Sequence, residues 1–360
     1  MYHEGAFIQT TLRLDVFGVP NESCYSPSPS NLAIDEAQGR TMVLTLYGMI
    51  CAVGVAGNLL VCIVLLRVPS LRSNTSDFLV HLSLVDLVVC VLVIPYKIVP
   101  QFIHSLPPNP TIWGQLRCRL YFGKFPFWTC AVTSVFSLVT VNLERFAAIV
   151  YPHRYKRIFG SRRNKLLVIL LCWILAVTNQ SFILFMYDEE GVVGCRFVGW
   201  SSAAFKALFG VFNITLSLVG PFVLMVSVQW KVISTLKRQV QNLTSQITLP
   251  PADRRKMWQL RTTQTLARTL LAFVLTFAVC WAPNQAVFLF YNLGAPICTS
   301  PQLYHLSVIL AVGNSCINPI LYGVTNRPFR KGIRTAFLGG GRSARIGHVP
   351  TVTPSAMTQA

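Results

Sequence analysis

Charged side chains are scarce in this chain. Only 12% of its 360 residues are Asp, Glu, Lys or Arg, half of the ~25% that is usual in a soluble domain. Hydrophobic residues make up 53%, which excludes a disordered chain as well. The 11 cysteines are spread too thinly for a small disulfide-stapled scaffold. Together these deficits indicate a protein that crosses a membrane several times.

The sequence also lacks catalytic motifs. Asp86 is the only acid deep inside an apolar stretch, whereas an intramembrane aspartyl protease needs two membrane carboxylates. Neither a zinc-protease pattern nor a Walker nucleotide-binding loop occurs. We therefore expect that the protein is not an enzyme and that it has no organic cofactor.

Long apolar stretches are what the sequence does contain. About 20 apolar residues in a helix cross the ~30 Å hydrocarbon core of a bilayer. Such stretches occur at seven places: 42–66, 78–99, 120–150, 166–186, 204–230, 269–293 and 303–324. The predicted fold class is an all-α membrane protein, with a seven-transmembrane helix bundle over residues 42–324.

Basic residues are concentrated between alternate spans, although the whole chain carries a formal charge of +19. These basic residues are Arg67, Arg72 and those of the segments 154–165, 231–268 and 327–345. The positive-inside rule places these segments in the cytoplasm. Eight of the 12 acids lie on the opposite side, in residues 1–41 and 188–190. We predict a multi-pass plasma-membrane protein with an extracellular N-terminal segment, 1–41, and no nucleic-acid partner.

Five residues on the outer side are candidates for covalent modification. Asn21 is the one accessible Asn-X-Ser/Thr glycosylation site. Cys118 and Cys195 are the cysteines best placed for an extracellular disulfide, because that compartment is oxidising. Cys24 and Cys298 form a possible second pair. An unused glycosylation site and free thiols are the alternatives.

Polar residues inside the spans are candidates for function because burying them in hydrocarbon is costly. Asp86 needs bundle polar groups or a bound cation as its partner. Asn314 and Asn318 are four residues apart and share one helical face. Pro319 leaves a carbonyl unpaired and predicts a kink beside that face. A protonated, purely structural Asp86 is the alternative.

Two further motifs predict moving parts. Glu144 and Arg145 stand side by side where span three reaches the cytoplasm, so Arg145 can bend to Glu144 or extend into a cavity. Trp281 lies beside Pro283, whose ring predicts a kink in span six. The alternatives are an arginine that reaches lipid headgroups and a tryptophan that only fills the core.

Taken together, the motifs resemble those of the rhodopsin-like (class A) G-protein-coupled receptors over residues 42 to about 338, within the neuropeptide-receptor neighbourhood of the galanin, allatostatin and RFamide-like receptors. The motifs occur in the family's order, one per span: Gly57-Asn58, Leu84-Val-Asp86-Leu, Glu144-Arg145-Phe146, Trp173, Pro221, Cys280-Trp281-Ala-Pro283 and Asn318-Pro319-Ile-Leu-Tyr322. The resemblance implies a G-protein-coupled receptor for an extracellular ligand.

The resemblance also implies residue roles. Arg145 would contact the G protein, Trp281 would be the switch beneath the ligand, and Tyr322 would swing inward on activation. Further sets would form a repacking cluster (Pro221, Val135 and Phe277) and a sodium and water site (Asp86, Ser134, Asn314 and Asn318). Residues 325–338 would be an amphipathic eighth helix on the membrane surface. The tail, 339–360, would meet receptor kinase and arrestin.

Several positions depart from the family's pattern. Gln229 replaces a tyrosine that meets Tyr322 in the active state, and His153 replaces a bulky apolar residue at the G protein. Cys118 lies two residues further from Arg145 than in most members. Either a bulge at Pro126 absorbs this shift or the helix begins differently.

The expected ligand follows from which receptor types the sequence excludes. Phe125 and Phe127 stand where an amine receptor needs a carboxylate, and 303–324 lacks the lysine of a photoreceptor. The outer acids favour a neuropeptide, attracted as a basic peptide by electrostatic steering. The predicted pocket contains Trp281, Gln285, Tyr304, Lys97 and Lys124.

Two alternatives stay open. Lys97 and Lys124 can meet a carboxylate, which leaves a receptor for an anionic lipid or small metabolite, although both lysines can also extend to the membrane interface. Gln229 and His153 leave open a non-signalling seven-helix scavenger.

Overall fold

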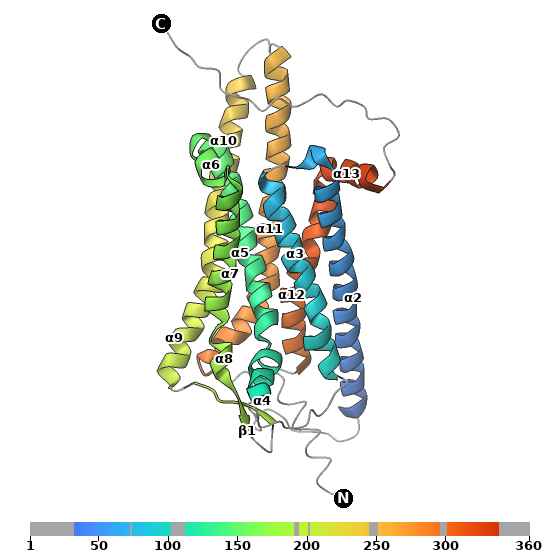
Figure 1. Ribbon diagram of the computed structural model, residues 1–360, viewed down its shortest axis with the longest axis vertical. Coiled ribbons are helices and arrows are strands. Elements are labelled where there is room, and N and C mark those ends of the chain that lie inside the picture. The colour runs from blue at the N-terminus through green and yellow to red at the C-terminus, as the bar shows by residue number, and fades with distance from the viewer. Residues whose placement is uncertain are drawn as a thin grey trace, which may run out of the picture.

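The computed structural model describes residues 32–72, 74–101, 112–190, 194–200, 202–244, 251–295 and 301–337. Long helical segments run side by side along the molecule (Figure 1). Seven of the described segments are long and apolar enough to cross a membrane. Their positions confirm the predicted fold class.

Three of the seven spans are single helices: α2 (Leu32–Arg67), α11 (Pro251–Asn292) and α12 (Pro301–Thr325). The other four are composite. The second joins α3 (Asn74–Val93) to η3 (Ile94–Ile98) and η4 (Val99–Gln101), and the fourth joins α7 (Arg162–Gln180) to α8 (Ile183–Met186). The third contains α4 (Ile112–Leu116), η5 (Arg117–Phe122) and α5 (Phe125–Val150), and the fifth contains α9 (Ala203–Ile214), η6 (Thr215–Val219) and α10 (Gly220–Thr244).

Two spans are longer than their apolar stretches predict. The apolar stretch of the fifth ends at residue 230 while its helix continues to Thr244, and the helix of the sixth starts at Pro251. Both extensions project beyond the other helices at one end of the bundle (Figure 1). Hydrocarbon sets the minimum length of a membrane helix and no maximum, so each helix can extend into the polar sequence beside its apolar stretch. Pro250-Pro251 is the helix breaker in the sequence between the two extensions.

The third span lies at the centre of the bundle. In its most apolar stretch 78% of the residues are buried within the protein, compared with 28% in the fourth and fifth spans. Large apolar side chains such as Leu170, Leu171 and Leu224 are exposed on the outer helices. Lipid solvates such side chains, so the hydrophobic exterior is that of a membrane bundle.

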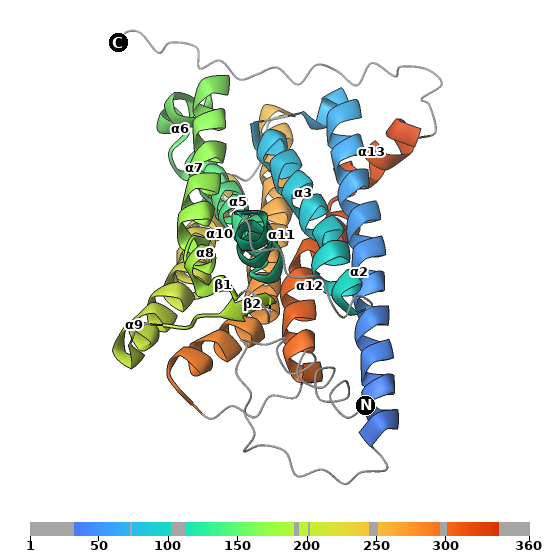
Figure 2. The same cartoon turned by 60° about the horizontal axis from the view of Figure 1, so that its bottom comes forward.

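The two ends of the bundle carry different structures. A hairpin of β1 (Tyr187–Glu190) and β2 (Gly194–Phe197) lies across one end, which we call the hairpin end (Figure 2). The opposite end carries the short helices η2 (Pro69–Leu71), α6 (Pro152–Phe159) and α13 (Arg327–Phe337). Helix α13 was predicted over 325–338 and turns away from the bundle axis (Figure 1).

The hairpin is attached covalently to span three. Cys118 and Cys195 form a disulfide, as predicted. In the antiparallel register Glu189 pairs with Cys195, and its carboxylate lies 3.6 Å from the guanidinium of Arg117, next to Cys118. A disulfide and an ion pair therefore hold the hairpin at the same place.

A break in span three explains the displaced Cys118. Residues Arg117–Phe122 form a wide π-helical turn, and Lys124 adopts a left-handed conformation (φ 59°) before α5 begins at Phe125. Pro126 lies in the first turn of α5, where a missing N–H costs nothing. The shift is thus absorbed by a π-turn and a new helix start, which combines the two predicted explanations.

Candidate ligand pocket and polar core

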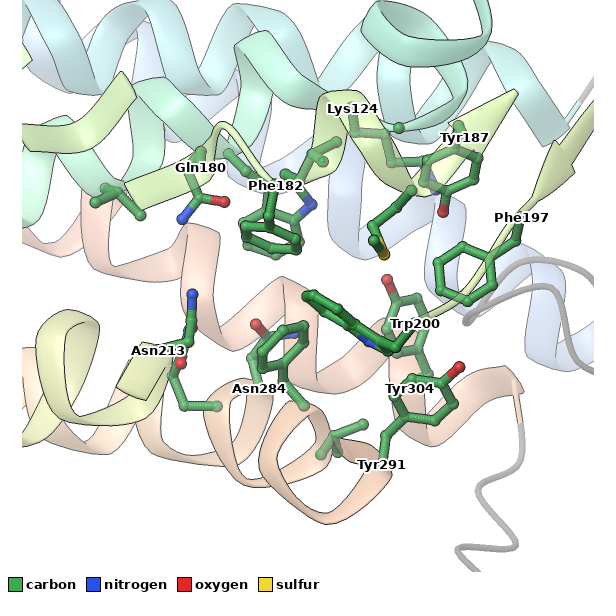
Figure 3. Close-up of a pocket in the computed structure, with 18 of the residues that line it drawn as sticks. Lys124, Gln180, Phe182, Tyr187, Phe197, Trp200, Asn213, Asn284, Tyr291 and Tyr304 are labelled. Atoms are coloured by element: carbon green, nitrogen blue, oxygen red, sulfur yellow. The ribbon is translucent and has the colours of Figure 1, made fainter. Parts of the chain in front are cut away.

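A cavity opens between the helices at the hairpin end. It is lined by 19 residues from the third to the seventh spans and the hairpin region. The lining includes four of the predicted pocket residues, Trp281, Gln285, Tyr304 and Lys124. Figure 3 shows Lys124, Gln180 and Tyr187 on one side of the cavity, with Asn213 and Tyr291 on the other.

Aromatic rings and carboxamides dominate the cavity wall. The nine rings belong to Trp128, Phe182, Tyr187, Phe197, Trp200, Trp281, Phe288, Tyr291 and Tyr304. The carboxamides are those of Gln180, Asn213, Asn284 and Gln285. Apolar walls with a few oriented polar groups are typical of ligand sites.

Lys97 lies behind this wall, although it was predicted within the pocket. The residue is only 2% exposed, so its side chain does not reach outward to the membrane interface. Its ammonium nitrogen lies 5.6–5.7 Å from the ring centroids of Phe127, Trp128 and Tyr304, a distance at which aromatic faces attract a cation. Two of these rings, Trp128 and Tyr304, also line the cavity.

Acids of the hairpin are already paired with arginines. Asp188 lies 3.9 Å from Arg119, and Glu189 lies 3.6 Å from Arg117. The sequence predicts these acids to be part of a negative outer surface, whereas in the structure two arginines face them. Their charges are partly compensated, which weakens the argument for a basic ligand.

Below the cavity, Asp86 is fully buried at the centre of the bundle. Ser134 donates a hydrogen bond of 2.5 Å to one carboxylate oxygen, and Asn318 donates one of 2.8 Å to the other. Asn314 is buried but forms no hydrogen bond with Asp86, and its side-chain oxygen has no partner among the described residues. Three of the four residues predicted for the sodium site, Asp86, Ser134 and Asn318, are thus joined by hydrogen bonds. The fourth, Asn314, contributes a side-chain oxygen that has no partner among the described residues. Carboxylate, hydroxyl and amide oxygens are suitable ligands for a hard cation.

The residues predicted to act as switches lie in the apolar core of the bundle. Trp281 is 2% exposed, and its ring lies 6.2 Å from that of Phe277. Val135 is fully buried in the same hydrophobic cluster, and Pro221 is buried in α10. Pro283 lies within α11 and Pro319 within α12. Tyr322 packs edge-on against Phe273 at 4.9 Å, and its hydroxyl has no partner among the described residues.

At the α13 end, Arg145 is held by Glu144. The guanidinium Nε lies 3.4 Å from a Glu144 carboxylate oxygen. Thr75 donates to that same oxygen at 2.7 Å, and Tyr155 donates to the other oxygen at 2.7 Å. Glu144 is completely buried, so these bonds replace its hydration. This is the bent, paired position that the sequence allowed for Arg145.

Sequence reasoning missed Thr75, Tyr155 and the pair Asn142–Gln229. Thr75, near the start of α3, and Tyr155, in α6, both donate to Glu144. Nothing in the sequence around either residue identifies it as a partner of Glu144. Asn142 did carry a signal, since it is a polar residue within an apolar stretch. Its partner could not be identified without the packing of α5 against α10.

Some predicted residues lie outside the part of the chain that the structure describes. These are Asn21, Cys24 and Cys298, together with the tail from residue 338. The predicted glycosylation site and second disulfide therefore remain predictions.

The bundle, the hairpin disulfide and the two polar clusters define a seven-helix membrane receptor. The family model of the seven-transmembrane receptors of the rhodopsin family matches residues 57–322. This chain belongs to that family, and its members are receptors.

Curated relatives extend this result. The chain is 29% identical to human somatostatin receptor type 3 over 92% of its own length and 75% of that receptor's. It is 26% identical to mouse galanin receptor type 1, over 82% of this chain and 81% of the receptor. The pig melanin-concentrating hormone receptor 1 is 29% identical, over 87% of this chain and 88% of the receptor.

Proposed function

We propose that this protein is a G-protein-coupled receptor that binds a peptide in the cavity at the hairpin end and activates a heterotrimeric G protein at the α13 end. The names of its relatives, receptors for somatostatin, galanin and melanin-concentrating hormone, support a peptide ligand. The observation that carries the proposal is that one helix, α11, reaches both the cavity and the opposite end of the bundle. It contributes Trp281 and Gln285 to the cavity and extends to the opposite end of the bundle.

The hairpin end faces the outside of the cell in this proposal. Its disulfide suits an oxidising compartment. Basic residues of α6 and α13, including Arg154, Lys156 and Arg330, lie at the other end, as the positive-inside rule requires for a cytoplasmic face.

In this proposal, the pairing of Arg145 with Glu144 is the resting arrangement of the receptor. A ligand that contacts Trp281 and fits a second arrangement of α11 better would shift the population toward it. Pro283 removes one helical hydrogen bond, so α11 can bend there at low cost. Movement of α11 would then open space at the α13 end, into which Arg145 extends toward the G protein.

Two further partners belong to the proposal. A sodium ion between Asp86, Ser134, Asn314 and Asn318 would stabilise the resting arrangement, since it would satisfy the free oxygen of Asn314. Receptor kinase and arrestin would act on the hydroxyl-bearing tail after α13, which ends the signal.

G-protein activation in cells that express the receptor tests the proposal, with a neuropeptide library as the challenge. We expect at least one peptide to signal, and we expect Arg145→Ala to abolish that signal while surface expression and peptide binding persist. Arg334→Ala, an exposed arginine of α13, is the matched control and should signal. Binding without signalling by the unmodified receptor would indicate a scavenger, and equal loss of binding and signalling in Arg145→Ala would contradict the role of Arg145.

A further inference from the structure

The charge of the ligand cavity is one-sided. Of its 19 lining residues none is Asp or Glu, and the single charged residue is Lys124. Lys124 forms no ion pair with any carboxylate of the described chain. A ligand group that enters this cavity therefore meets a positive charge that the lining residues do not compensate.

The backbone of Lys124 is strained in the position that brings its side chain to the cavity. It is the one non-glycine residue with positive φ among those described, at 59°. This left-handed conformation is costly for a side chain with a Cβ, whereas glycine or asparagine adopts it readily. Strained residues of this kind cluster at functional sites. A lysine at this position is thus consistent with a binding role.

Two more lysines stand behind the rings of the wall. Lys97 is held over Trp128 and Tyr304, as described above. On another side, the Lys206 ammonium lies 3.7 Å from the ring centroid of Tyr291. All three rings line the cavity. In a low-dielectric bundle these charges add to the positive potential inside it.

Unsatisfied polar groups on the cavity residues indicate what the ligand must offer. The indole N–H of Trp281 has no acceptor among the described residues, and the side-chain oxygen of Gln285 has no donor. Both residues are buried at 2% and 6% exposure. A carboxylate only accepts hydrogen bonds, and a peptide N–H donates one. An N-acylated amino acid carries both groups next to each other.

We propose that this cavity binds the acidic end of the ligand, a carboxylate attached to an aromatic or apolar residue, with Lys124 as its counter-charge. The inference rests on the proposed function and deepens it, because the free C-terminus of a peptide has this chemistry. Small aromatic organic acids share the carboxylate and differ in lacking the peptide bond.

Small probes test the proposal without a known agonist. Purified full-length receptor in nanodiscs is titrated with N-acetyltryptophan, its neutral amide N-acetyltryptophanamide, and the cation tryptamine, and binding is followed by ligand-observed NMR. We expect N-acetyltryptophan to bind at least about tenfold more tightly than tryptamine, with the amide between them. Indole-3-acetate has the same ring and charge without a peptide bond. Weaker binding of this acid supports a peptide C-terminus, and equal binding supports carboxylates in general.

Variants of Lys124 assign the preference to that residue. Lys124→Asn removes the charge and suits the left-handed backbone, so it should fold and lose the preference for N-acetyltryptophan. Lys124→Arg keeps the charge and should retain it. Lys331→Gln removes an exposed charge on α13 and is the control. Absence of saturable N-acetyltryptophan binding, a preference for tryptamine, or an unchanged preference in Lys124→Asn would each overturn the proposal. Failure of the peptide library to signal is a separate result, and it bears only on the proposed function.

Discussion

Gln229 of α10 donates a hydrogen bond of 2.5 Å from its amide nitrogen to the side-chain oxygen of Asn142 in α5. Both residues are completely buried. The amide nitrogen of Asn142 is in turn bound to the Leu138 carbonyl at 2.8 Å, which fixes the orientation of Asn142. Gln229 thus connects spans three and five at the position where the family usually has a tyrosine that contacts Tyr322 in the active state.

This bond predicts that Gln229 restrains the resting receptor. It is present while Arg145 is paired with Glu144, and outward movement of α10, which packs against α11, would break it. Gln229→Leu should therefore raise ligand-independent G-protein activation, by up to roughly tenfold for a hydrogen bond worth ~0.5–1.5 kcal/mol. This ligand-independent activity is measured as nucleotide exchange by the G protein in membranes that contain equal amounts of each receptor variant. Ser227→Ala, on the exposed side of the same helix, is the control, and basal activity equal in both variants would contradict the restraint.

Close packing at Gly54 predicts a strong steric effect. A Cβ at this position would overlap Cys90 Sγ and lie 2.8 Å from Cys316 Sγ, in the contact of α2 with α3 and α12. Gly54→Ala should lower the free energy of unfolding by ~1–3 kcal/mol and lower the thermal midpoint of the purified receptor. Gly48→Ala, whose Cβ would have no neighbour within 4 Å, should not. Adding Cys90→Ala to Gly54→Ala should restore part of the loss, and the absence of any restoration would show that the clash is not the cause.

The Asp86 cluster predicts stabilisation by sodium. Replacing choline chloride with sodium chloride should raise the thermal midpoint, because a bound ion adds ~1.4 kcal/mol when its concentration is about ten times its Kd. Asp86→Asn preserves the size of the side chain and should remove this dependence. Asp77→Asn changes an acid that is paired with Lys165 at the α13 end, so it should respond to sodium like the unmodified receptor. A midpoint that is insensitive to sodium would rule out the site.

Removing the disulfide between Cys118 and Cys195 should cause a large loss of receptor stability. It closes a sequence separation of 77 residues, for which chain entropy suggests ~4–5 kcal/mol of stabilisation. The double variant Cys118→Ser with Cys195→Ser should show a lower thermal midpoint and a smaller surface fraction in cells. Cys51→Ser, which removes a cysteine outside this disulfide, is the control. A normal thermal midpoint and normal surface expression of the double variant would contradict a stabilising role for this disulfide.

Much of the fold and part of the site followed from the sequence. Apolar stretches such as 42–66 specify membrane helices because unpaired backbone groups are not tolerated in hydrocarbon. Asp86, Asn318 and Arg145 were identifiable because polar residues in a membrane span are costly and therefore informative. The start of α5 could not be located, since a two-residue shift fits either a bulge or a displaced helix start.

The sequence by itself therefore determined the seven spans, the family motifs, the Cys118–Cys195 pair and the polar-core candidates Asp86, Asn318 and Arg145. Only the tertiary structure decided which distant side chains meet: Gln229 with Asn142, Tyr155 with Glu144, and Arg117 with Glu189. It also placed Lys97 behind rings of the cavity and left Lys124 inside it. Hydropathy fixes which segments enter the membrane, whereas the rotation and offset of each helix depend on packing against its neighbours, which no single segment encodes.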